Sequence, residues 1–456
     1  MIKTPLTQFE SELIEIEDLF KGAKDLKITH LFTETENKVV NTFTFSGKSY
    51  AFGNFIKNGN DPIVRKRLIK RYAKLSLYKA LSAFYGENKP WGSLTGIRPT
   101  KLAYQAQLEG EDVTDFFTNV LKVSKEKTQL VNSVLNAQKG IYSKTDDLTD
   151  FFVFIPFCPS RCKYCSFITA DVNRSKNKVE EYLTALEKEI ICAKRHVKNL
   201  KSIYIGGGTP VALSDEQFER VLSLLDDINT GVEFTVEAGR PDRITESKIE
   251  IMKRHKITRI CLNPQTFNDK TLALIGRNHT SQDILRVYDL VKDQFIVNMD
   301  LIAGLEGESV EDFKFSLDKA ISLNPDNITV HTLCVKKGSY LANEKQVLDD
   351  NGVSCMVEYA HEQLLTNGYE PYYLYRQKYM AGNLENTGYC KPNKQCVYNI
   401  NVMEEISNNI ACGAGSISKK VFSAENRIER QANPKDVVTY IEKVDSVIEL
   451  KDKFFC

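Results

Sequence analysis

The chain has 456 residues, of which 42% are hydrophobic and 27% charged, and its formal net charge at pH 7 is +1. This length is sufficient for two or three domains, and the composition is that of an ordinary folded protein. A nearly neutral chain lacks the positive field typical of proteins that bind nucleic acids or anionic membranes. No apolar run reaches the roughly 18 residues of a membrane span, and no apolar signal-peptide core is evident. The eleven cysteines are therefore expected to be reduced thiols in a cytoplasmic protein.

The first predicted domain, residues 1–145, mixes helical and strand patterns, and we expect an α+β fold whose role the sequence does not reveal. An acidic helix and two alternating strands are predicted near its start, over residues 9–20, 38–45 and 49–55. Asp61 and Pro62 then mark the start of a longer helix, because proline is common in the first helical turn. The loop 91–101, which carries the only tryptophan, is predicted to be ordered and to precede another helix.

The helix that follows Pro62 is strongly basic on one side and apolar on another. Its cations are Arg65, Lys66, Arg67, Lys70, Arg71, Lys74 and Lys79. A solvated charged face beside an apolar stripe is the favoured interpretation. The alternative is a patch that binds an anionic partner, either carboxylates or RNA phosphates.

The second predicted domain, residues 146–350, consists of apolar strands that alternate with helical patterns. Six strands are predicted, over residues 152–156, 202–206, 233–237, 259–263, 296–302 and 327–331. Helices are predicted between them, over residues 177–197, 214–228, 245–255, 281–293 and 309–323. Apolar strands joined by regular helical crossovers form a parallel sheet. Ligand-binding residues are then expected at the C-terminal ends of the strands.

The third predicted region, residues 351–456, is expected to cover the substrate. It begins with a helical pattern over 355–367 and continues with a polar, aromatic stretch at 372–379. A run of small residues, 411–416, follows a short helix. No low-complexity tract is evident.

Three cysteines in the pattern C-x3-C-x2-C, Cys158, Cys162 and Cys165, directly follow the first strand of the second domain. An iron–sulfur cluster usually has four cysteine ligands, so a cluster held by these three leaves one iron open for chemistry. A zinc site is the alternative, but it needs a fourth ligand, and Cys390 and Cys396 are distant and loosely spaced. The remaining cysteines, including Cys412, are expected to be unligated thiols, although the sequence leaves a second metal site at Cys390, Cys396 or Cys412 open.

Polar residues and glycines recur at the ends of the next four strands. Gly206, Gly207 and Gly208 precede Thr209, and consecutive glycines let a backbone approach a ligand closely. Glu237 ends the third strand, Gln265 lies just past the fourth, and Asp300 lies in the fifth. Carboxylates buried there require a partner or a ligand. Arg277 can supply a fixed fork for a carboxylate.

The motifs FIPFCPSRCKYCSF, IGGGTP, VEAGRPD, NPQTF, GRNHT and MDLIAGL occur in this order. Together they resemble the radical S-adenosylmethionine (SAM) superfamily, and specifically its oxygen-independent coproporphyrinogen III oxidase (dehydrogenase) family. The resemblance covers residues 151–333, with a weaker similarity over 372–417, and WGSLTGIRPTK and GNLENTGYCKP resemble the HemZ branch. It implies an α/β fold: a partial (β/α)6 barrel with an N-terminal α+β domain and a small C-terminal domain.

The resemblance also implies two cofactors, a 4Fe–4S cluster and S-adenosylmethionine. Cys158, Cys162 and Cys165 would hold the cluster. The residues expected around S-adenosylmethionine are Tyr164, Gly207, Gly208, Thr209, Glu237, Gln265, Arg277, Asp300 and Ile417. No catalytic residue is assigned beyond the cluster and cofactor ligands.

The implied activity is oxidative decarboxylation of propionate side chains of coproporphyrinogen III to vinyl groups, in porphyrin and haem biosynthesis. An electron from a low-potential donor cleaves S-adenosylmethionine, and the 5′-deoxyadenosyl radical abstracts hydrogen from a propionate. The expected partner is therefore a small tetrapyrrole, with no membrane and no nucleic acid. Its propionates require cationic anchors, for which Arg376, Lys378 and the basic helix are candidates by charge.

Three phenylalanines depart from the family pattern and leave two alternatives open. Phe152 and Phe154 stand where typical oxidases have tyrosine and histidine, and Phe167 replaces a cysteine. Phenylalanine cannot form the hydrogen bonds of the residues it replaces. Relatives with the last change include haem chaperones that do not decarboxylate a substrate, so a haem-binding carrier is one alternative. A radical enzyme that modifies RNA, motivated by the basic helix, is the other.

Overall fold

The structure is a computed structural model that describes residues 2–56, 61–96, 98–143, 145, 147–167, 170–336, 339–340, 350–377, 380–425 and 427–456. It contains two compact units, residues 1–132 and 133–456. The predicted domain boundaries at residues 145 and 350 stay a prediction. Within the described ranges no helix is long and apolar enough to cross a membrane.

The first unit is an antiparallel sheet covered by helices, which confirms the predicted α+β character. Strands β2 (Ile28–Glu34), β3 (Lys38–Phe45) and β4 (Lys48–Phe55) pair antiparallel, and β1 (Ile2–Lys3) joins β2 in parallel. Helices α1 (Glu10–Glu17) and α2 (Pro62–Tyr85) pack with this sheet, and Asp61 caps α2 as the sequence predicts. The remaining helices are α3 (Pro99–Leu108), α4 (Val113–Asp115) and α5 (Lys125–Ala137), the last of which continues into the second unit.

The second unit is organised by one sheet of eleven strands, and its centre contains all six predicted strands in chain order. These are β5 (Leu148–Ile155), β8 (Asn199–Gly207), β9 (Glu233–Val236), β10 (Arg259–Cys261), β11 (Ile296–Ala303) and β12 (Asn327–Thr332). Each pairs in parallel with the next, so all six C-terminal ends lie on the same side. The predicted parallel α/β sheet is confirmed.

C-terminal segments extend this sheet at both ends. Strands β14 (Asn386–Cys390) and β13 (Glu370–Tyr375) continue antiparallel from β12. At the other end β15 (Asn408–Cys412) pairs in parallel with β5, and β16 (Ile417–Phe422) and β17 (Arg427–Ala432) follow antiparallel. The polar, aromatic stretch at 372–379 thus begins as a strand, which its composition did not reveal.

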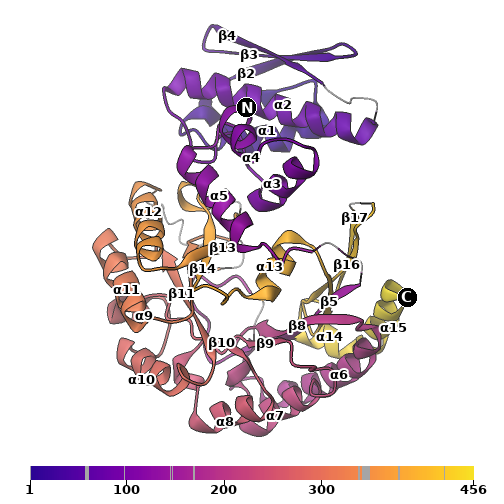
Figure 1. Cartoon of the computed structure of the whole chain (residues 1–456), viewed down its shortest axis with the longest axis vertical. Helices are drawn as coiled ribbons and strands as arrows, with labels where there is room; N and C mark the ends of the chain where they lie inside the picture. The colour runs from indigo at the N-terminus through magenta and orange to yellow at the C-terminus, as the bar shows by residue number, and fades with distance from the viewer. Residues whose placement is uncertain are drawn as a thin grey trace. The chain divides into compact units, whose positions relative to one another are not determined.

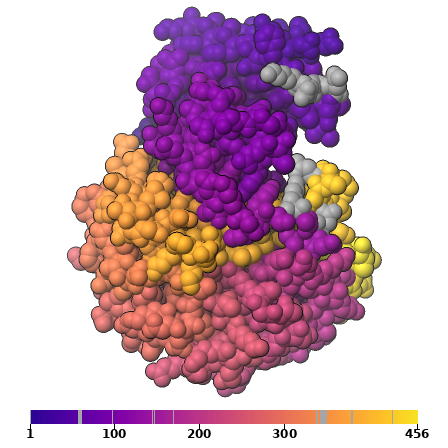
Figure 2. Space-filling view, in the orientation of Figure 1, coloured from indigo at the N-terminus to yellow at the C-terminus, as the bar shows by residue number. Residues whose placement is uncertain are grey.

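The crossover helices form an outer layer around the parallel strands (Figure 1). In chain order they are α6 (Lys176–Ala193), α7 (Asp215–Ser223), α8 (Glu246–Arg254), α9 (Asp269–Leu274), α10 (Ser281–Val291), α11 (Val310–Leu323) and α12 (Asp350–Thr366). Figure 2 shows the part of the chain that carries them, from magenta to orange, as a continuous surface on the face in view. Serine and threonine N-caps fix the start of four of them, at Ser214, Thr245, Thr280 and Ser309.

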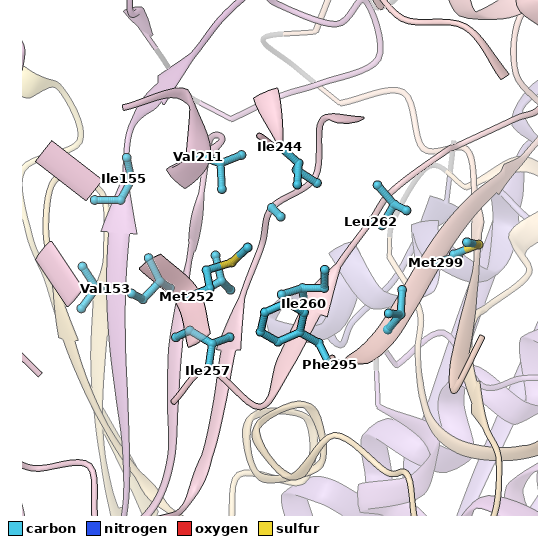
Figure 3. Packing of buried hydrophobic residues seen from close by; sticks show 14 of the residues in the cluster. Val153, Ile155, Val211, Ile244, Met252, Ile257, Ile260, Leu262, Phe295 and Met299 are labelled. Atoms are coloured by element: carbon cyan, nitrogen blue, oxygen red, sulfur yellow. The ribbon is translucent and has the colours of Figure 1, made fainter. Parts of the chain in front are cut away.

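The core between strands and helices is apolar and combines aliphatic with aromatic side chains. Figure 3 shows side chains of β5, β10, β11 and α8 packed together, with Ile260 of β10 between Met252 and Met299. All three of these side chains are fully buried. Because central parallel strands are covered on both faces, their residues read as continuous apolar runs rather than alternating ones.

A buried carboxylate joins the N-terminal ends of the strands, opposite to the ligand-binding side. Asp150 of β5 accepts hydrogen bonds from Ser202 Oγ (2.5 Å), Asn401 Nδ2 (3.0 Å) and the Ser407 hydroxyl. Burial raises the pKa of Asp150 from its ordinary 3.8 to about 6, although these hydrogen bonds favour the charged form. Asp150 thereby links β5 and β8 to helix α13 (Val397–Glu404) and the start of β15.

We expect Ile260→Ala to lower the free energy of unfolding by about 2–5 kcal/mol, because it opens a cavity in a packed core. Urea denaturation of the variant and the parent measures this difference. Ile191→Ala is the control, since Ile191 is exposed on α6 and its truncation should cost less than about 0.5 kcal/mol. Equal losses in the two variants would contradict the assigned core.

We expect Asp150→Asn to change how stability depends on pH. The raised folded-state pKa means that Asp150 stabilises the parent fully below pH 3.8 and loses this contribution as the pH rises through 6. Relative to the variant, the parent's free energy of unfolding should therefore fall by about 2–3 kcal/mol between pH 4 and pH 7. Urea denaturation across this range measures the difference, and parallel pH profiles would rule out the assigned shift.

Candidate active site

A cavity of about 560 Å³ lies at the C-terminal ends of the parallel strands. Every residue that the sequence predicted for the cluster or for S-adenosylmethionine lines it: Cys158, Cys162, Tyr164, Cys165, Gly207, Gly208, Thr209, Glu237, Gln265, Arg277, Asp300 and Ile417. The structure therefore brings the predicted set together in one place. The binding role of each residue stays a prediction.

The cysteine loop is held by its backbone and by the turn that precedes α10. It follows the short strand β6 (Phe157–Cys158), which pairs with β7 (Ala170–Asp171). Lys163 N donates to Ile275 O (3.0 Å), and Ser160 Oγ donates to Gly276 O (3.2 Å). Inside the loop, Cys165 N donates to Cys162 O (3.1 Å). These bonds turn all three thiols toward one cavity.

The three thiols suit a cluster better than a single metal ion. Within the described residues, no three Cys, His, Asp or Glu side chains stand close enough to share one ion, as tetrahedral zinc requires. In an iron–sulfur cluster each thiolate binds a different iron, so the thiols stand further apart. Burial, with the nearby Cys162 and Cys158, raises the pKa of Cys165, and a bound metal would reverse this by taking up the thiolate.

The glycine turn after β8 presses against the first thiol. Gly207 has φ of +106°, a conformation that other residues rarely adopt. A Cβ on Gly208 would lie 2.5 Å from Phe157 O and 2.9 Å from Cys158 Sγ. Thr209 Oγ1 lies 3.6 Å from the same sulfur. Only glycine at 208 lets this backbone reach the cysteine loop. The turn therefore forms part of the site in addition to connecting β8 to the next helix.

Arg277 is buried and already bonded to the protein. Its Nη1 donates to Asn263 O (2.5 Å), and its Nη2 donates to Tyr164 Oη (3.1 Å). Burial raises the pKa of Tyr164, so the phenol stays neutral and accepts this bond. The Nε of Arg277 has no hydrogen-bond partner among the described residues. Arg277 thus joins the cysteine loop to the strand ends, which leaves less of the guanidinium for the fork to a ligand carboxylate that the sequence suggested.

Two half-buried carboxylates, Glu237 just after β9 and Asp300 in β11, have opposite protonation preferences. Glu237 accepts hydrogen bonds from the Tyr204 hydroxyl and from Asn263 Nδ2 (3.2 Å), and burial together with the charge of Asp300 raises its pKa. Burial also opposes ionisation of Asp300, but His331 Nε2 at 3.5 Å holds the pKa of Asp300 below its ordinary value. The pair therefore favours one charged and one neutral carboxyl group.

Gln265 occupies a strained backbone position beside this pair. Its φ is +70°, and its backbone bonds strand β11 through Asp300 O (2.8 Å) and Ile302 N (3.0 Å). Gln265 Oε1 and Asn263 Oδ1 are buried and have no hydrogen-bond partner within the described residues. Unsatisfied buried acceptors are costly, so a ligand with hydrogen-bond donors would complete them. The amino and ribose hydroxyl groups of S-adenosylmethionine are such donors, and the residues present fit this cofactor.

Several cavity residues were not predicted. Tyr204 and Tyr398 stack with their ring centroids 4.2 Å apart, and Phe152 stacks on Tyr398 at 5.9 Å. His331 lies at the end of β12, where the strand-end rule that identified Glu237 would also have found it. No comparable signal exists for Tyr398, because it reaches the cavity from helix α13, which no motif marks.

Arg376, one of the cations suggested as substrate anchors, does not line the cavity. Arg376 is buried away from it and donates to Asn383 O (2.8 Å) and Leu384 O (3.4 Å). Burial lowers the pKa of Arg376 to about 10, with Glu385 opposing this shift. Lys378 lies outside the described residues. The cavity is instead lined by Arg161, Arg240 and Lys336.

The basic helix α2 uses most of its cations within the first unit. Three of them form ion pairs: Arg65 with Glu34, Arg67 with Glu109, and Lys70 with Glu12. Lys74 donates to Thr95, and two others stack on rings, Arg71 on Phe116 and Lys79 on Phe52. This pattern is that of a folded unit's own surface and does not favour an RNA-binding patch.

Two of the three additional thiols considered for metal binding have ordinary structural surroundings. Cys390, Cys396 and Cys412 are all buried. Cys396 Sγ donates to Glu233 Oε1 (3.2 Å) at the start of β9, and Cys412 ends strand β15 within the core. Each contact is sufficient to explain a buried cysteine without a metal.

Comparison with known proteins agrees with this geometry. Residues 152–320 match the model of the radical SAM superfamily. The oxygen-independent coproporphyrinogen-III oxidase-like protein HemZ of Bacillus subtilis (strain 168) is 36% identical over 394 residues, which are 82% of this chain and 78% of the relative. The haem chaperone HemW of the same organism is 34% identical over 203 residues, which are 43% of this chain and 53% of the relative.

A solved structure shows the same fold. Coproporphyrinogen III oxidase (HemN) from Escherichia coli, a radical SAM enzyme, aligns with a TM-score of 0.54 and 21% identity over 69% of this chain and 72% of its own. The cofactors of the superfamily are a 4Fe–4S cluster and S-adenosylmethionine. The chain belongs to the radical SAM superfamily and, within it, to the HemZ-like branch of the oxygen-independent coproporphyrinogen III oxidase family.

Proposed function

We propose that the protein oxidatively decarboxylates the propionate side chains of coproporphyrinogen III to give protoporphyrinogen IX. One observation carries this proposal: a single cavity combines three cluster-type thiols with unsatisfied acceptors and paired carboxyl groups at the strand ends. The similarity to HemZ over 82% of the chain supports the same substrate class. The reaction accounts for both the radical site and the space beside it.

When bound, the cluster and S-adenosylmethionine together supply a one-electron reductive cleavage that produces a hydrogen-abstracting radical. The chain's own residues bind and orient the reactants. Cys158, Cys162 and Cys165 would hold the cluster, and Gly208 gives the backbone access to it. Gln265 and Asn263 would accept hydrogen bonds from the cofactor through their free oxygens.

The overall change at each of the two propionates that react is balanced as follows. One hydrogen atom leaves the carbon next to the ring, the carboxyl group leaves as carbon dioxide, and a vinyl group forms. One electron remains and must pass to an external one-electron acceptor. The aromatic side chains of Phe152, Phe154 and Tyr398 line the cavity and would exclude water from it during the reaction.

The substrate carboxylates require cations at the cavity. Arg240 is already paired with Asp242 (2.9 Å), whereas Lys336 has no ion-pair partner among the residues that the structure describes. Arg161 lies over the Tyr340 ring, 5.0 Å from its centroid. Lys336 is therefore the proposed anchor of a propionate group, in place of Arg376.

A haem chaperone is the second candidate function. Two observations favour it: the similarity to HemW over 43% of the chain, and the stacked rings of Phe152, Tyr204 and Tyr398. A flat aromatic wall suits a planar haem as well as it suits a porphyrinogen. The two candidates differ in turnover, because a chaperone binds haem and releases no vinyl product.

An anaerobic turnover assay distinguishes these functions. Cluster-reconstituted protein is incubated with reductant, S-adenosylmethionine, an electron acceptor and coproporphyrinogen III, and both 5′-deoxyadenosine and protoporphyrinogen IX are measured. We expect both products to accumulate. Cofactor cleavage without vinyl product would refute the substrate, and stable haem binding under the same conditions would favour the chaperone.

We expect Cys162→Ala to lose most of its iron and the cluster's visible absorbance after anaerobic reconstitution, because two thiolates cannot hold the cluster firmly. Iron analysis and absorbance spectroscopy measure this loss. The control is Cys355→Ala, since Cys355 is an exposed thiol on α12 outside the cavity and its removal should leave the iron content unchanged. Retention of the cluster in Cys162→Ala would contradict the ligand assignment.

A further inference from the structure

The turn between β15 and β16 forms one wall of the cavity, through Gly415, Ser416 and Ile417. It begins at Gly413, whose φ is +102°. A Cβ at this position would lie 2.5 Å from both Phe154 O and Tyr182 Oη. The turn is therefore packed directly on the end of strand β5 and on helix α6, with no room for a side chain.

One tyrosine hydroxyl connects this turn to the strand that leads into the cysteine loop. Tyr182 of α6 donates to Phe154 O (2.6 Å) and accepts from Ala414 N (3.2 Å). Its side chain is fully buried, so neither bond competes with water. The position of the turn is thus set relative to β5.

A buried carboxylate on the same helix, Glu189, binds the backbone of the turn at Gly413. Glu189 is 0% exposed, and its Oε2 accepts from Gly413 N (2.7 Å) and Tyr440 Oη (2.6 Å). Its Oε1 accepts from Asn433 Nδ2 (2.8 Å) and lies 3.3 Å from Lys451 Nζ. Both oxygens are therefore satisfied, which is the condition for burying such a charge.

Lys451 extends this grip to both strands that flank the turn. Its Nζ donates to Ala411 O (2.7 Å) in β15 and to Ser418 Oγ (2.9 Å) in β16. It reaches them from helix α15 (Val444–Phe455), and Tyr440 comes from α14 (Val437–Glu442). A buried ion pair often stabilises less than apolar packing would, but its directional bonds to β15 and β16 restrict the positions that these two strands can take.

We propose that Tyr182 and Glu189 are positioning residues that hold the 413–417 turn in its ligand-binding conformation, with α14 and α15 as the outer support. None of the side chains that grip the turn lines the cavity, so they act through the turn. This inference rests on the proposed function and on the predicted contact between Ile417 and S-adenosylmethionine. A turn that is already ordered binds its ligand without an additional entropic cost.

The test measures the affinity of the cluster-loaded protein for S-adenosylmethionine by anaerobic equilibrium dialysis with labelled cofactor. In Tyr182→Phe, which loses only the hydroxyl, we expect Kd to rise about five- to tenfold with cluster absorbance unchanged. In Tyr440→Phe, which weakens the support of Glu189 without touching the turn, we expect a rise of about two- to fivefold.

Tyr288→Phe is the matched control. Tyr288 is also a buried tyrosine on an outer helix, α10, and donates to a single carbonyl, Leu323 O (2.8 Å), away from the cavity. It should lower Tm comparably and leave Kd within about twofold. A parent-like Kd in both Tyr182→Phe and Tyr440→Phe, or an equal rise in Tyr288→Phe, would overturn the proposal.

Two other outcomes also decide the question. Loss of the cluster in Tyr182→Phe would assign the effect to the cysteine loop and overturn the positioning role. Failure of the parent itself to bind S-adenosylmethionine would refute the proposed function and this inference together, whereas a binding parent with unaffected variants would refute only the inference.

Discussion

The site depends on the close approach between the glycine turn and the first cluster-type thiol. Parallel pairing of β5 with β8 aligns Ile155 with Gly207, so the segments that follow these two strands leave the sheet side by side. One segment continues to Cys158 and the other to Gly208. The two segments lie so close that there is no space for a Cβ on Gly208. The position of the thiols therefore depends both on the strand register and on the absence of a side chain at Gly208. The remaining strand ends are arranged around this contact.

The polar groups of the cavity are costly in the isolated protein. Gln265 adopts a left-handed backbone, and its side-chain oxygen and that of Asn263 are buried without a hydrogen-bond donor among the described residues. Such costs are characteristic of sites that are completed by a ligand. The large apolar core from β5 across to β11 supplies stability that offsets the cost of these unsatisfied polar groups. One end of the sheet therefore stabilises the fold, and the other carries the site.

Much of the fold could be predicted from the sequence because the βα pattern is local. Each of the six parallel strands was identified by a short apolar run, and Glu237 and Asp300 were found because parallel strands place their ends together. Tyr398 could not be found in this way, since it reaches the cavity from α13 and stacks on Tyr204, a residue far away in the sequence. Arg376 shows the opposite error: charge alone suggested a ligand contact, whereas burial against carbonyl groups decides its role.

The unequal carboxyl pair, Glu237 and Asp300, has a consequence for which small molecules the cavity accepts. ATP carries the same adenosine group as S-adenosylmethionine but bears several negative charges, while the sulfonium compound carries a positive one. The negative charge at Asp300, which His331 partners at 3.5 Å, repels triphosphates and attracts the sulfonium ion. At Asp300 the charge therefore favours the sulfonium compound, whereas Arg161, Arg240, Arg277 and Lys336 of the same cavity attract anionic groups.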